Sequence, residues 1–273
     1  MKINNKHWLD DYEPLETLKC PKNKEKFTEG QPDTIIIHYT ASSSAEGSAK
    51  YLVRDDIKAS AHLVIGRDGK IFQMVPFDTM SWHAGVSSFG DREGFNKYSI
   101  GIELDNAGVL EPVGGDYMAW FGKKYILDEV IEAQHKNEGG KRHWHIYTEK
   151  QLAVCQEVCQ ILIEKYGVRS VLGHDEISPG RKQDPGPAFP MEKFRNILLY
   201  HNRVSEEISE VNGYGEIIPE YLNIRSGPDL NFDTVSNPLD AGTKVKILEH
   251  RYGWYKVRTE LEGWVKKDFV KMI

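Results

Sequence analysis

The sequence predicts an α/β domain, with a mixed central sheet flanked by helices, followed by a small all-β domain. In the first part, short β-branched apolar runs alternate with helical patterns, as in chains that pack helices on a central sheet. From residue 213 onward, short alternating strands are separated by turn residues. The intervening residues 204–212 are polar and weakly periodic, which is typical of a linker. We therefore place the domains at residues 1–203 and 213–273.

Three segments of the first domain have strand patterns. Residues 34–40 (TIIIHYT) form a β-branched apolar run that ends in polar side chains, which suits a buried strand that opens onto a site. Residues 62–75 contain two apolar runs around Arg-Asp-Gly and predict a hairpin with Asp-Gly in its turn. Residues 99–106 (SIGIELDN) form a further strand that ends in acidic and amide groups. We expect these strands to form the middle of the sheet.

Residues 148–167 predict the clearest helix. Apolar residues recur there at intervals of three and four, Thr148 suits the N-cap, and Gly167 suits the stop. Cys155 and Cys159 lie four residues apart and therefore share one face of this helix. Because their neighbours are apolar, we favour buried free thiols over a metal or redox role. Three cysteines in all do not build a disulfide framework.

The remaining parts of the first domain have weaker patterns. Residues 171–189 contain several glycines and prolines after a short strand-like start, so we expect mostly loop. We interpret residues 1–30 as an N-terminal extension and residues 108–147 as a partly helical insertion outside the core sheet. Within the insertion, KRHWH (141–145) has the residue types of a small metal site, although we favour a solvated face anchored by aromatic side chains.

Composition excludes several classes of function. The chain of 273 residues carries 35 Lys and Arg against 41 Asp and Glu, a net charge of −6. This balance argues against a nucleic-acid-binding surface spread over the whole protein, and we expect no nucleic-acid partner. No apolar run approaches the roughly 18–20 residues of a membrane-spanning helix. No apolar stretch follows the first lysine, so we expect no signal peptide in this chain.

Two histidines and one aspartate suggest a metal site. His38 ends the apolar strand at 34–40, where a side chain is held rigidly while facing a cleft. His174 follows Val-Leu-Gly at another strand end, and Asp184 lies in the rigid frame Lys-Gln-Asp-Pro-Gly-Pro. Two imidazoles and a carboxylate match the three protein ligands of a catalytic zinc, which leaves a fourth position for water. The alternative is that these strand-end histidines are merely hydrogen-bonded.

Four blocks of sequence carry a resemblance to a known family. In chain order they are IIIHYTAS, SAHLVIGRDGKIFQMVPFDTMSWHAG, YSIGIELDNAG and GHDEISPGRKQDPGPAF. They resemble zinc-dependent N-acetylmuramoyl-L-alanine amidases of the type-2 amidase family, over residues 30–195. The resemblance implies that Zn²⁺ is the cofactor and that His38, His174 and Asp184 are its ligands.

The resemblance also implies two catalytic residues. Glu103 falls where peptidoglycan-recycling members place a catalytic glutamate, and Lys182 falls on the catalytic lysine of the family. Ala61 stands where some phage members have a catalytic tyrosine, which favours Glu103 as the base. A carboxylate can take a proton from water and pass it to a leaving nitrogen, and a fixed lysine can stabilise an oxyanion. The alternatives are a strand-end carboxylate paired with a surface lysine, and a solvated loop charge.

Three further residues are candidates for binding substrate. Trp82 offers a face on which a sugar can stack, and His83 offers a hydrogen-bond donor, because Trp-His-Ala-Gly recurs near the substrate cleft of the family. A core tryptophan and a hydrogen-bonded histidine are the alternatives. We expect Arg181 to bind a muropeptide carboxylate through two hydrogen bonds. We interpret His62 as a structural strand histidine rather than as a ligand.

The C-terminal segment resembles a bacterial SH3-like domain, a small β-barrel often attached to wall hydrolases as a targeting module. The resemblance rests on Asn-Ile-Arg-Ser-Gly-Pro at 223–228 and Gly-Trp-Val at 263–265, and it covers residues 213–273. We expect Tyr252 and Trp254 to be exposed, where they would suit a glycan or peptide ligand. The alternative is a domain that only packs on the amidase.

Together these observations predict a zinc-dependent amidase that cleaves peptidoglycan between N-acetylmuramic acid and L-alanine, in the manner of an endolysin or autolysin. Alternatives are a cytosolic anhydromuropeptide-recycling amidase, a non-catalytic peptidoglycan-binding protein and an interbacterial toxin. We expect peptidoglycan or muropeptides as partners and a monomeric protein. It would form a cytoplasmic pool or be released to act at the bacterial cell wall.

Overall fold

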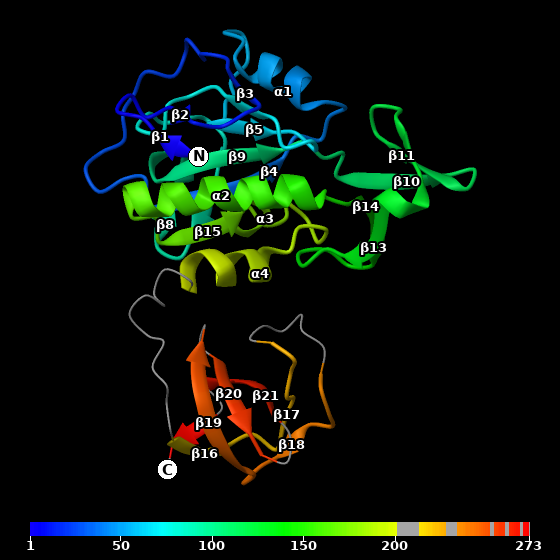
Figure 1. Ribbon diagram of the computed structural model, residues 1–273. Helices are drawn as coiled ribbons and strands as arrows, with labels where there is room; N and C mark the ends of the chain where they lie inside the picture. Colours follow the sequence, from blue (N-terminus) through cyan, green and yellow to red (C-terminus); the bar gives the residue numbers. More distant parts are fainter. Residues whose placement is uncertain (201–212, 228–233, 252–253, 260–261, 268–269, 273) are drawn as a thin grey trace. The chain divides into compact units, whose positions relative to one another are not determined.

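We describe a computed structural model of the protein, which contains two compact units (Figure 1). The units are Met1–Met191 and Glu192–Ile273. The structure describes residues 1–200, 213–227, 234–251, 254–259, 262–267 and 270–272. The predicted linker at 204–212 lies outside the described residues.

A six-stranded mixed sheet forms the centre of the first unit, which confirms the predicted α/β class. Its strand order is β15-β4-β9-β5-β6-β3, and all neighbours are parallel except β5 and β6. The strands are β3 (Leu15–Thr17), β4 (Thr34–Tyr39), β5 (Leu63–Ile65), β6 (Ile71–Gln73), β9 (Ser99–Leu104) and β15 (Ser170–Gly173).

The central strands are buried on both faces, as their continuous apolar runs predict. Ile35, Ile36 and Ile37 of β4 are fully buried. The predicted hairpin is confirmed, because β5 and β6 pair antiparallel around the turn that holds Asp68 and Gly69. Asp68 accepts a hydrogen bond from the backbone N–H of Lys70, and Gly69 has a φ of +86°, a value that favours glycine.

The described part of the chain contains four α-helices, the first three of them in the first unit. They are α1 (Ala45–Leu52), α2 (Glu149–Tyr166), α3 (His174–Ile177) and α4 (Met191–Arg195), the last followed by a π-helical segment at Asn196–Tyr200. Helix α2 begins and ends as predicted: Thr148 accepts a hydrogen bond from the Gln151 N–H, and Gly167 adopts the left-handed conformation. Cys155 and Cys159 are buried free thiols, as expected.

The predicted partly helical insertion is wrong, because this segment folds as a second sheet beside the first (Figure 1). The sheet is antiparallel, with the order β12-β11-β10-β14-β13. A Gly-Gly pair at 114–115, both with positive φ, closes its first hairpin, and such turns match the twist of paired strands. The strands are β10 (Val109–Val113), β11 (Asp116–Ala119), β12 (Lys124–Tyr125), β13 (Val130–Gln134) and β14 (Lys141–His145), with a 3₁₀ turn at Leu127–Glu129.

The insertion also buries a histidine that was expected to be solvated. Trp144 of β14 is 1% exposed and anchors the sheet, as the aromatic pattern indicated. His145 is buried as well, beside Tyr125, and its Nδ1 accepts a hydrogen bond from the Ala107 N–H. The KRHWH segment therefore has a buried end rather than one solvated face.

Short strands complete the first unit. Residues near the N-terminus pair as β1 (Lys2–Ile3) and β2 (Leu9–Asp10). A second small pair joins β7 (Ser88–Phe89) and β8 (Arg92–Glu93), followed by a 3₁₀ turn at Phe95–Lys97. In the described part of the chain, the structure contains no helix long and apolar enough to cross a membrane.

From residue 213 onward the described part of the second unit is all-β, as predicted. Its five-stranded antiparallel sheet has the order β21-β20-β19-β16-β22, and β17 pairs with β18. Trp254 is only 6% exposed, so the expectation that it is an exposed ligand-binding aromatic is wrong; Tyr252 lies outside the described residues. The strands are β16 (Gly213–Ile217), β17 (Tyr221–Leu222), β18 (Leu239–Asp240), β19 (Lys244–Arg251), β20 (Trp254–Arg258), β21 (Glu262–Lys266) and β22 (Val270–Met272).

His62 is a fully buried histidine that the fold keeps neutral. Its Nε2–H donates to the Thr79 carbonyl, while its Nδ1 accepts hydrogen bonds from the Ser81 hydroxyl and the Gly101 N–H. Burial lowers the pKa of His62 to about 4. In the unfolded chain the pKa of histidine is about 6.5, so between these values the unfolded state binds more protons. The contribution of His62 to the free energy of unfolding is therefore fully present above about pH 6.5, and it is lost as the pH falls toward 4.

We predict that His62 contributes up to about 3 kcal/mol to the loss of unfolding free energy between pH 7 and pH 4. Urea unfolding followed by circular dichroism, on the native protein and on His62→Gln, measures this term. The variant should be less stable at pH 7 but lose less stability on acidification, because the other titrating groups are common to both proteins. If the free energies of unfolding of the two proteins changed with pH in parallel, His62 would not take up a proton on unfolding.

Candidate metal centre and cleft

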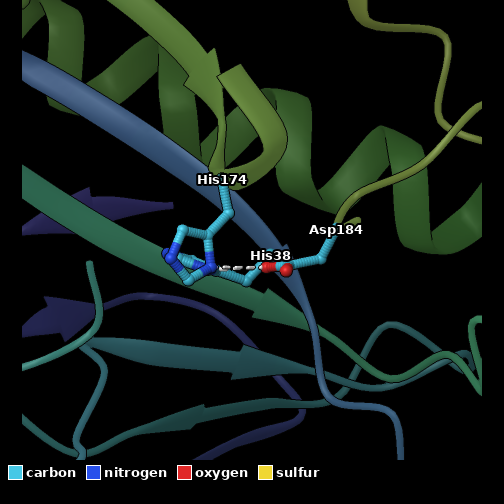
Figure 2. Close-up of side chains that lie close together, drawn as sticks. All are labelled: His38, His174 and Asp184. Atoms are coloured by element: carbon cyan, nitrogen blue, oxygen red, sulfur yellow. Dashed lines mark hydrogen bonds and ion pairs between the residues drawn. The ribbon is translucent and has the colours of Figure 1, made fainter. Parts of the chain in front are cut away.

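Adjacent strand ends bring the predicted metal ligands together. Strands β15 and β4 are parallel, with Gly173 opposite Ile37. The next residues along these strands are His174, which begins α3, and His38. The loop after α3 brings Asp184 back to the same edge of the sheet, so that the three side chains converge (Figure 2).

The three converging atoms are close together and buried. His38 Nδ1, His174 Nδ1 and Asp184 Oδ2 are each 2.9 Å from the other two. The exposed fractions of these residues are 1%, 3% and 7%, respectively. When the histidine, cysteine and acidic side chains of the described residues are considered together, these three are the ones that lie close enough to hold a metal ion.

The hydrogen bonds around the trio leave electron pairs facing one another. His174 Nε2 lies 3.1 Å from the Ala84 carbonyl oxygen, which only accepts, so Nε2 carries the proton and Nδ1 keeps its lone pair. Burial lowers the pKa of His38 to about 4, so this imidazole is neutral. The site thus presents two imidazoles and a carboxylate, a donor set that fits a divalent metal ion.

The insertion and α3 hold the loop that carries Asp184. The Asp184 carbonyl accepts a hydrogen bond of 2.7 Å from the Asp175 N–H. His135, which follows β13, lies 3.2 Å from the Gln183 carbonyl oxygen, and the Gln183 side chain bonds to Glu138. Polar contacts from two elements therefore fix a segment that has little regular structure of its own.

Glu103 lies beside His38 on the neighbouring strand. It pairs with His38 in the parallel register of β4 and β9, so both side chains project from the same face. Its Oε2 is buried and has no hydrogen-bond partner within the described part of the chain. Burial, and then the charge of Asp184, raise the pKa of Glu103 well above its ordinary value, although Lys182 opposes this shift. The surroundings of Glu103 therefore favour its protonated form.

Glu103, Lys182 and the three converging residues line one cavity of about 830 Å³. Lys182 lies on the loop between α3 and Asp184, and its backbone N–H donates to the Ser178 carbonyl. The structure thus brings together all five residues predicted to bind metal or act in catalysis. A cavity of this size can hold a drug-sized molecule or part of a polymer.

The three predicted substrate-binding residues have different surroundings. Trp82 is 41% exposed and lies outside the described lining of the cavity. His83 lines the cavity but is only 8% exposed, and its Nδ1 lies 2.9 Å from His38 Nε2. Arg181 also lines the cavity, and its Nη2 donates to the carbonyls of Ala84 and Val86.

The insertion contributes two residues to the cavity that the sequence did not point to. Trp120 is 79% exposed at the cavity, and its indole N–H donates to the Ala41 carbonyl at 2.8 Å. Glu138 lines the same cavity. An alternation of polar and apolar residues around Gly114-Gly115 was the available signal for a hairpin, but nothing in the sequence indicated which strands it would approach.

Comparisons with known proteins agree with this arrangement. The family model for N-acetylmuramoyl-L-alanine amidases matches residues 28–187, and the model for bacterial SH3 domains matches residues 220–271. The 1,6-anhydro-N-acetylmuramyl-L-alanine amidase AmpD of Escherichia coli (strain K12) is 37% identical over 144 residues, which is 52% of this chain and 60% of AmpD. The N-acetylmuramoyl-L-alanine amidase AmiD of the same strain is 29% identical over 168 residues, 58% of this chain and 50% of AmiD.

The matched region therefore spans only 50–60% of the length of these two curated relatives. A crystal structure of a selenomethionine derivative of AmpD aligns with a TM-score of 0.48 and 26% identity, over 72% of this chain and 99% of that one. The amidase model covers more than half of the present sequence, including His38, Glu103 and His174. On this basis the chain belongs to the N-acetylmuramoyl-L-alanine amidase family and carries, in addition, a bacterial SH3 domain.

Proposed function

We propose that the protein is a zinc-dependent amidase that hydrolyses the bond between N-acetylmuramic acid and L-alanine in peptidoglycan. The observation that carries this proposal is the convergence of three buried electron-pair donors, 2.9 Å apart, in a cavity that also contains Glu103. Family membership supports the choice of substrate, because the relatives that this chain resembles are named for this amide bond.

His38 Nδ1, His174 Nδ1 and Asp184 Oδ2 would hold the zinc ion. When bound, zinc supplies a water molecule of lowered pKa and polarises the scissile carbonyl group. The chain supplies three ligands of the type used in catalytic zinc sites, and it keeps the cavity side of the trio open.

Glu103 would move the proton. It lies next to His38 on the same face of the sheet, in a dry environment that favours its protonated form. In its ionised form the carboxylate can accept a proton from the attacking water, and its raised pKa makes it a stronger base for this step. The resulting carboxylic acid can then donate that proton to the leaving amine nitrogen. Amide hydrolysis needs both transfers, because an unprotonated amine is a poor leaving group.

Lys182 would stabilise the negative charge that develops on the carbonyl oxygen. It is tied by its backbone to Ser178 and lines the cavity with Asp184. In comparable sites a fixed donor of this kind contributes about 3–4 kcal/mol to transition-state stabilisation. We further propose that Trp82 offers a stacking face for a sugar and that Arg181 meets a carboxylate of the stem peptide.

The biological substrate has two candidates, each favoured by a specific observation. The SH3 domain favours intact cell wall, because tethering to a polymer raises the local concentration of cleavable bonds. The similarity to AmpD favours soluble anhydromuropeptides, because that relative is named as a 1,6-anhydro-N-acetylmuramyl-L-alanine amidase. We propose intact wall as the main substrate, with action at the bacterial cell wall.

Digestion of purified sacculi and of soluble anhydromuropeptides tests the proposal. Mass spectrometry should detect free stem peptides that begin with L-alanine, together with glycan strands that retain the lactyl carboxylate. His38→Ala, His174→Ala and Asp184→Ala should each abolish both the products and the retention of zinc, because each removes one of three ligands. As a matched control, His143→Ala changes a histidine of the insertion and should preserve both.

Muropeptides cut at a glycosidic bond, or at a bond within the stem peptide, would contradict the proposed chemistry. Full activity after exhaustive chelation, with removal of the metal verified by elemental analysis, would contradict the role of zinc. Turnover on sacculi that exceeds turnover on soluble muropeptides would support intact wall, and the reverse order would support the recycling alternative.

Glu103→Gln and Lys182→Ala should retain zinc but lose turnover by ~100-fold or more, because each residue acts on the transition state and not on the metal. Steady-state kinetics on a soluble muropeptide and elemental analysis of the same samples give the two readouts. Glu111→Gln, which changes an exposed carboxylate on β10, is the matched control. Near-native turnover in either variant would remove the role assigned to that residue.

A further inference from the structure

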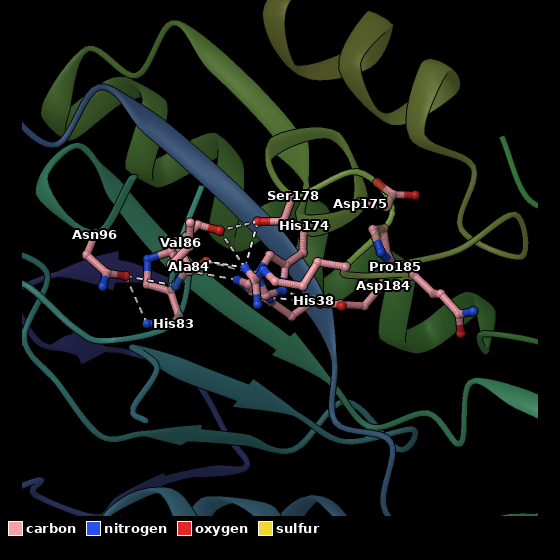
Figure 3. A network of polar contacts seen from close by, with 12 residues as sticks. His38, His83, Ala84, Val86, Asn96, His174, Asp175, Ser178, Asp184 and Pro185 are labelled. Atoms are coloured by element: carbon pink, nitrogen blue, oxygen red, sulfur yellow. Dashed lines mark hydrogen bonds and ion pairs between the residues drawn. The ribbon is translucent and has the colours of Figure 1, made fainter. Parts of the chain in front are cut away.

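His83 lies behind His38, on the side away from the metal position. Its Nδ1 is 2.9 Å from His38 Nε2, and the two rings meet edge to face at 85°, with centroids 5.1 Å apart (Figure 3). The contact thus involves the nitrogen of His38 opposite to the one that faces His174 and Asp184. His83 therefore contacts His38, one of the proposed metal ligands, and does not face the position that the metal would occupy.

The fold holds the His83 ring in a place reserved for it. The Asn96 side-chain oxygen accepts hydrogen bonds from the backbone N–H groups of His83 and Ala84, at 3.0 and 2.8 Å. The ring lies over Gly101 of β9, where an added Cβ would fall 2.3 Å from His83 Cγ. Any residue larger than glycine at position 101 would displace the ring. The contacts of Asn96 with the backbone and the absence of a side chain at Gly101 together fix the position of the His83 ring.

The far side of the ring determines which nitrogen carries the proton. His83 Nε2 lies 3.1 Å from the Ser99 carbonyl oxygen and 3.2 Å from the Ser99 hydroxyl oxygen. The Ser99 hydroxyl donates its own proton to the Phe95 carbonyl at 2.5 Å, so both Ser99 oxygens act as acceptors towards His83. His83 must therefore donate from Nε2, and its Nδ1 is left as an acceptor.

From this chain of hydrogen bonds we infer that His83 is a positioning residue that selects the metal-binding tautomer of His38. Because His83 Nδ1 accepts, His38 must donate from Nε2, which leaves a lone pair on His38 Nδ1. The inference rests on the proposed metal function and deepens it, since it names the group that prepares one ligand.

The selection matters because a competing tautomer is available to His38. With its proton on Nδ1, His38 would donate to Asp184 Oδ2, 2.9 Å away, and would block the metal position. In that tautomer His38 Nε2 and His83 Nδ1 would confront each other with two lone pairs in a buried space. Leaving two buried acceptors unpaired is unfavourable, so His83 opposes the blocked form.

This arrangement also bears on the predicted role of His83 as a donor to substrate. Its Nδ1 accepts from His38 and its Nε2 donates to Ser99, so both ring nitrogens already have partners. We therefore favour the positioning role.

Zinc affinity of the full-length protein tests the inference without measuring hydrolysis. Metal-free protein is titrated with zinc in competition with a chromophoric chelator, for the native protein, His83→Leu and His83→Gln. Loss of an outer partner of a ligating histidine typically weakens metal binding 10- to 100-fold, and we expect this loss for His83→Leu. Glutamine has a carbonyl oxygen to accept from His38 and an amide to donate to Ser99, so His83→Gln should recover most of the affinity.

His145→Leu is the matched control, because it removes another buried histidine that does not itself line the cavity. It should reduce thermal stability but leave zinc affinity unchanged. Equal losses of affinity in His83→Leu and His83→Gln would show that His83 acts by packing alone and would overturn the inference. Unchanged affinity in His83→Leu would overturn it as well.

A spectroscopic measurement keeps the inference testable if His83→Leu does not fold. Long-range ¹H–¹⁵N spectra of the metal-free native protein report which ring nitrogen carries the proton. We expect His38 and His83 both to be protonated on Nε2, whereas protonation of His38 on Nδ1 would overturn the inference. If zinc binds with the expected dependence on His83 while no muropeptide is cleaved, the proposed reaction fails and the role of His83 stands.

Discussion

The parallel pairing of β15, β4 and β9 is the constraint on which the rest of the site depends. Parallel strands end at the same edge of a sheet, so the residues at their carboxyl ends become neighbours whatever their distance in sequence. Here that edge brings His174 next to His38, 136 residues apart in the chain, and sets Glu103 opposite His38. The apolar residues of β4 fix these side chains from behind, because Ile35, Ile36 and Ile37 are fully buried.

Burying this group of side chains has a physical consequence. A buried carboxylate and two buried imidazoles lose the solvation of water, and unpaired electron pairs 2.9 Å apart repel one another. A divalent cation bound here would remove both penalties at once, and metal binding would then be linked to local stability in this unit. The polar contacts from the insertion sheet, through His135 and Glu138, hold the Asp184 loop in place against that repulsion.

The sequence predicted those features that depend on local pattern. The strand at 34–40, the hairpin at 62–75 and the caps of α2 follow from periodicity and turn chemistry, which act over a few residues. The insertion was misjudged because its polar alternation is weak and its partners are distant strands. The burial of Trp254 could not be predicted either, since an aromatic residue in an alternating strand can face either side of a small sheet. Likewise, the contact of His83 with His38 depends on the space above Gly101, which only the folded chain defines.

X-ray absorption at the zinc edge, on the purified full-length protein, tests the central claim most directly. The expected spectrum is that of one zinc ion with two histidine nitrogens and oxygen donors at about 2.0–2.2 Å. In Asp184→Ala this environment should be lost, because the variant lacks one of the three ligands contributed by the chain. A zinc environment that contains sulfur, or one that is unchanged in Asp184→Ala, would contradict the assignment of His38, His174 and Asp184 as the metal site.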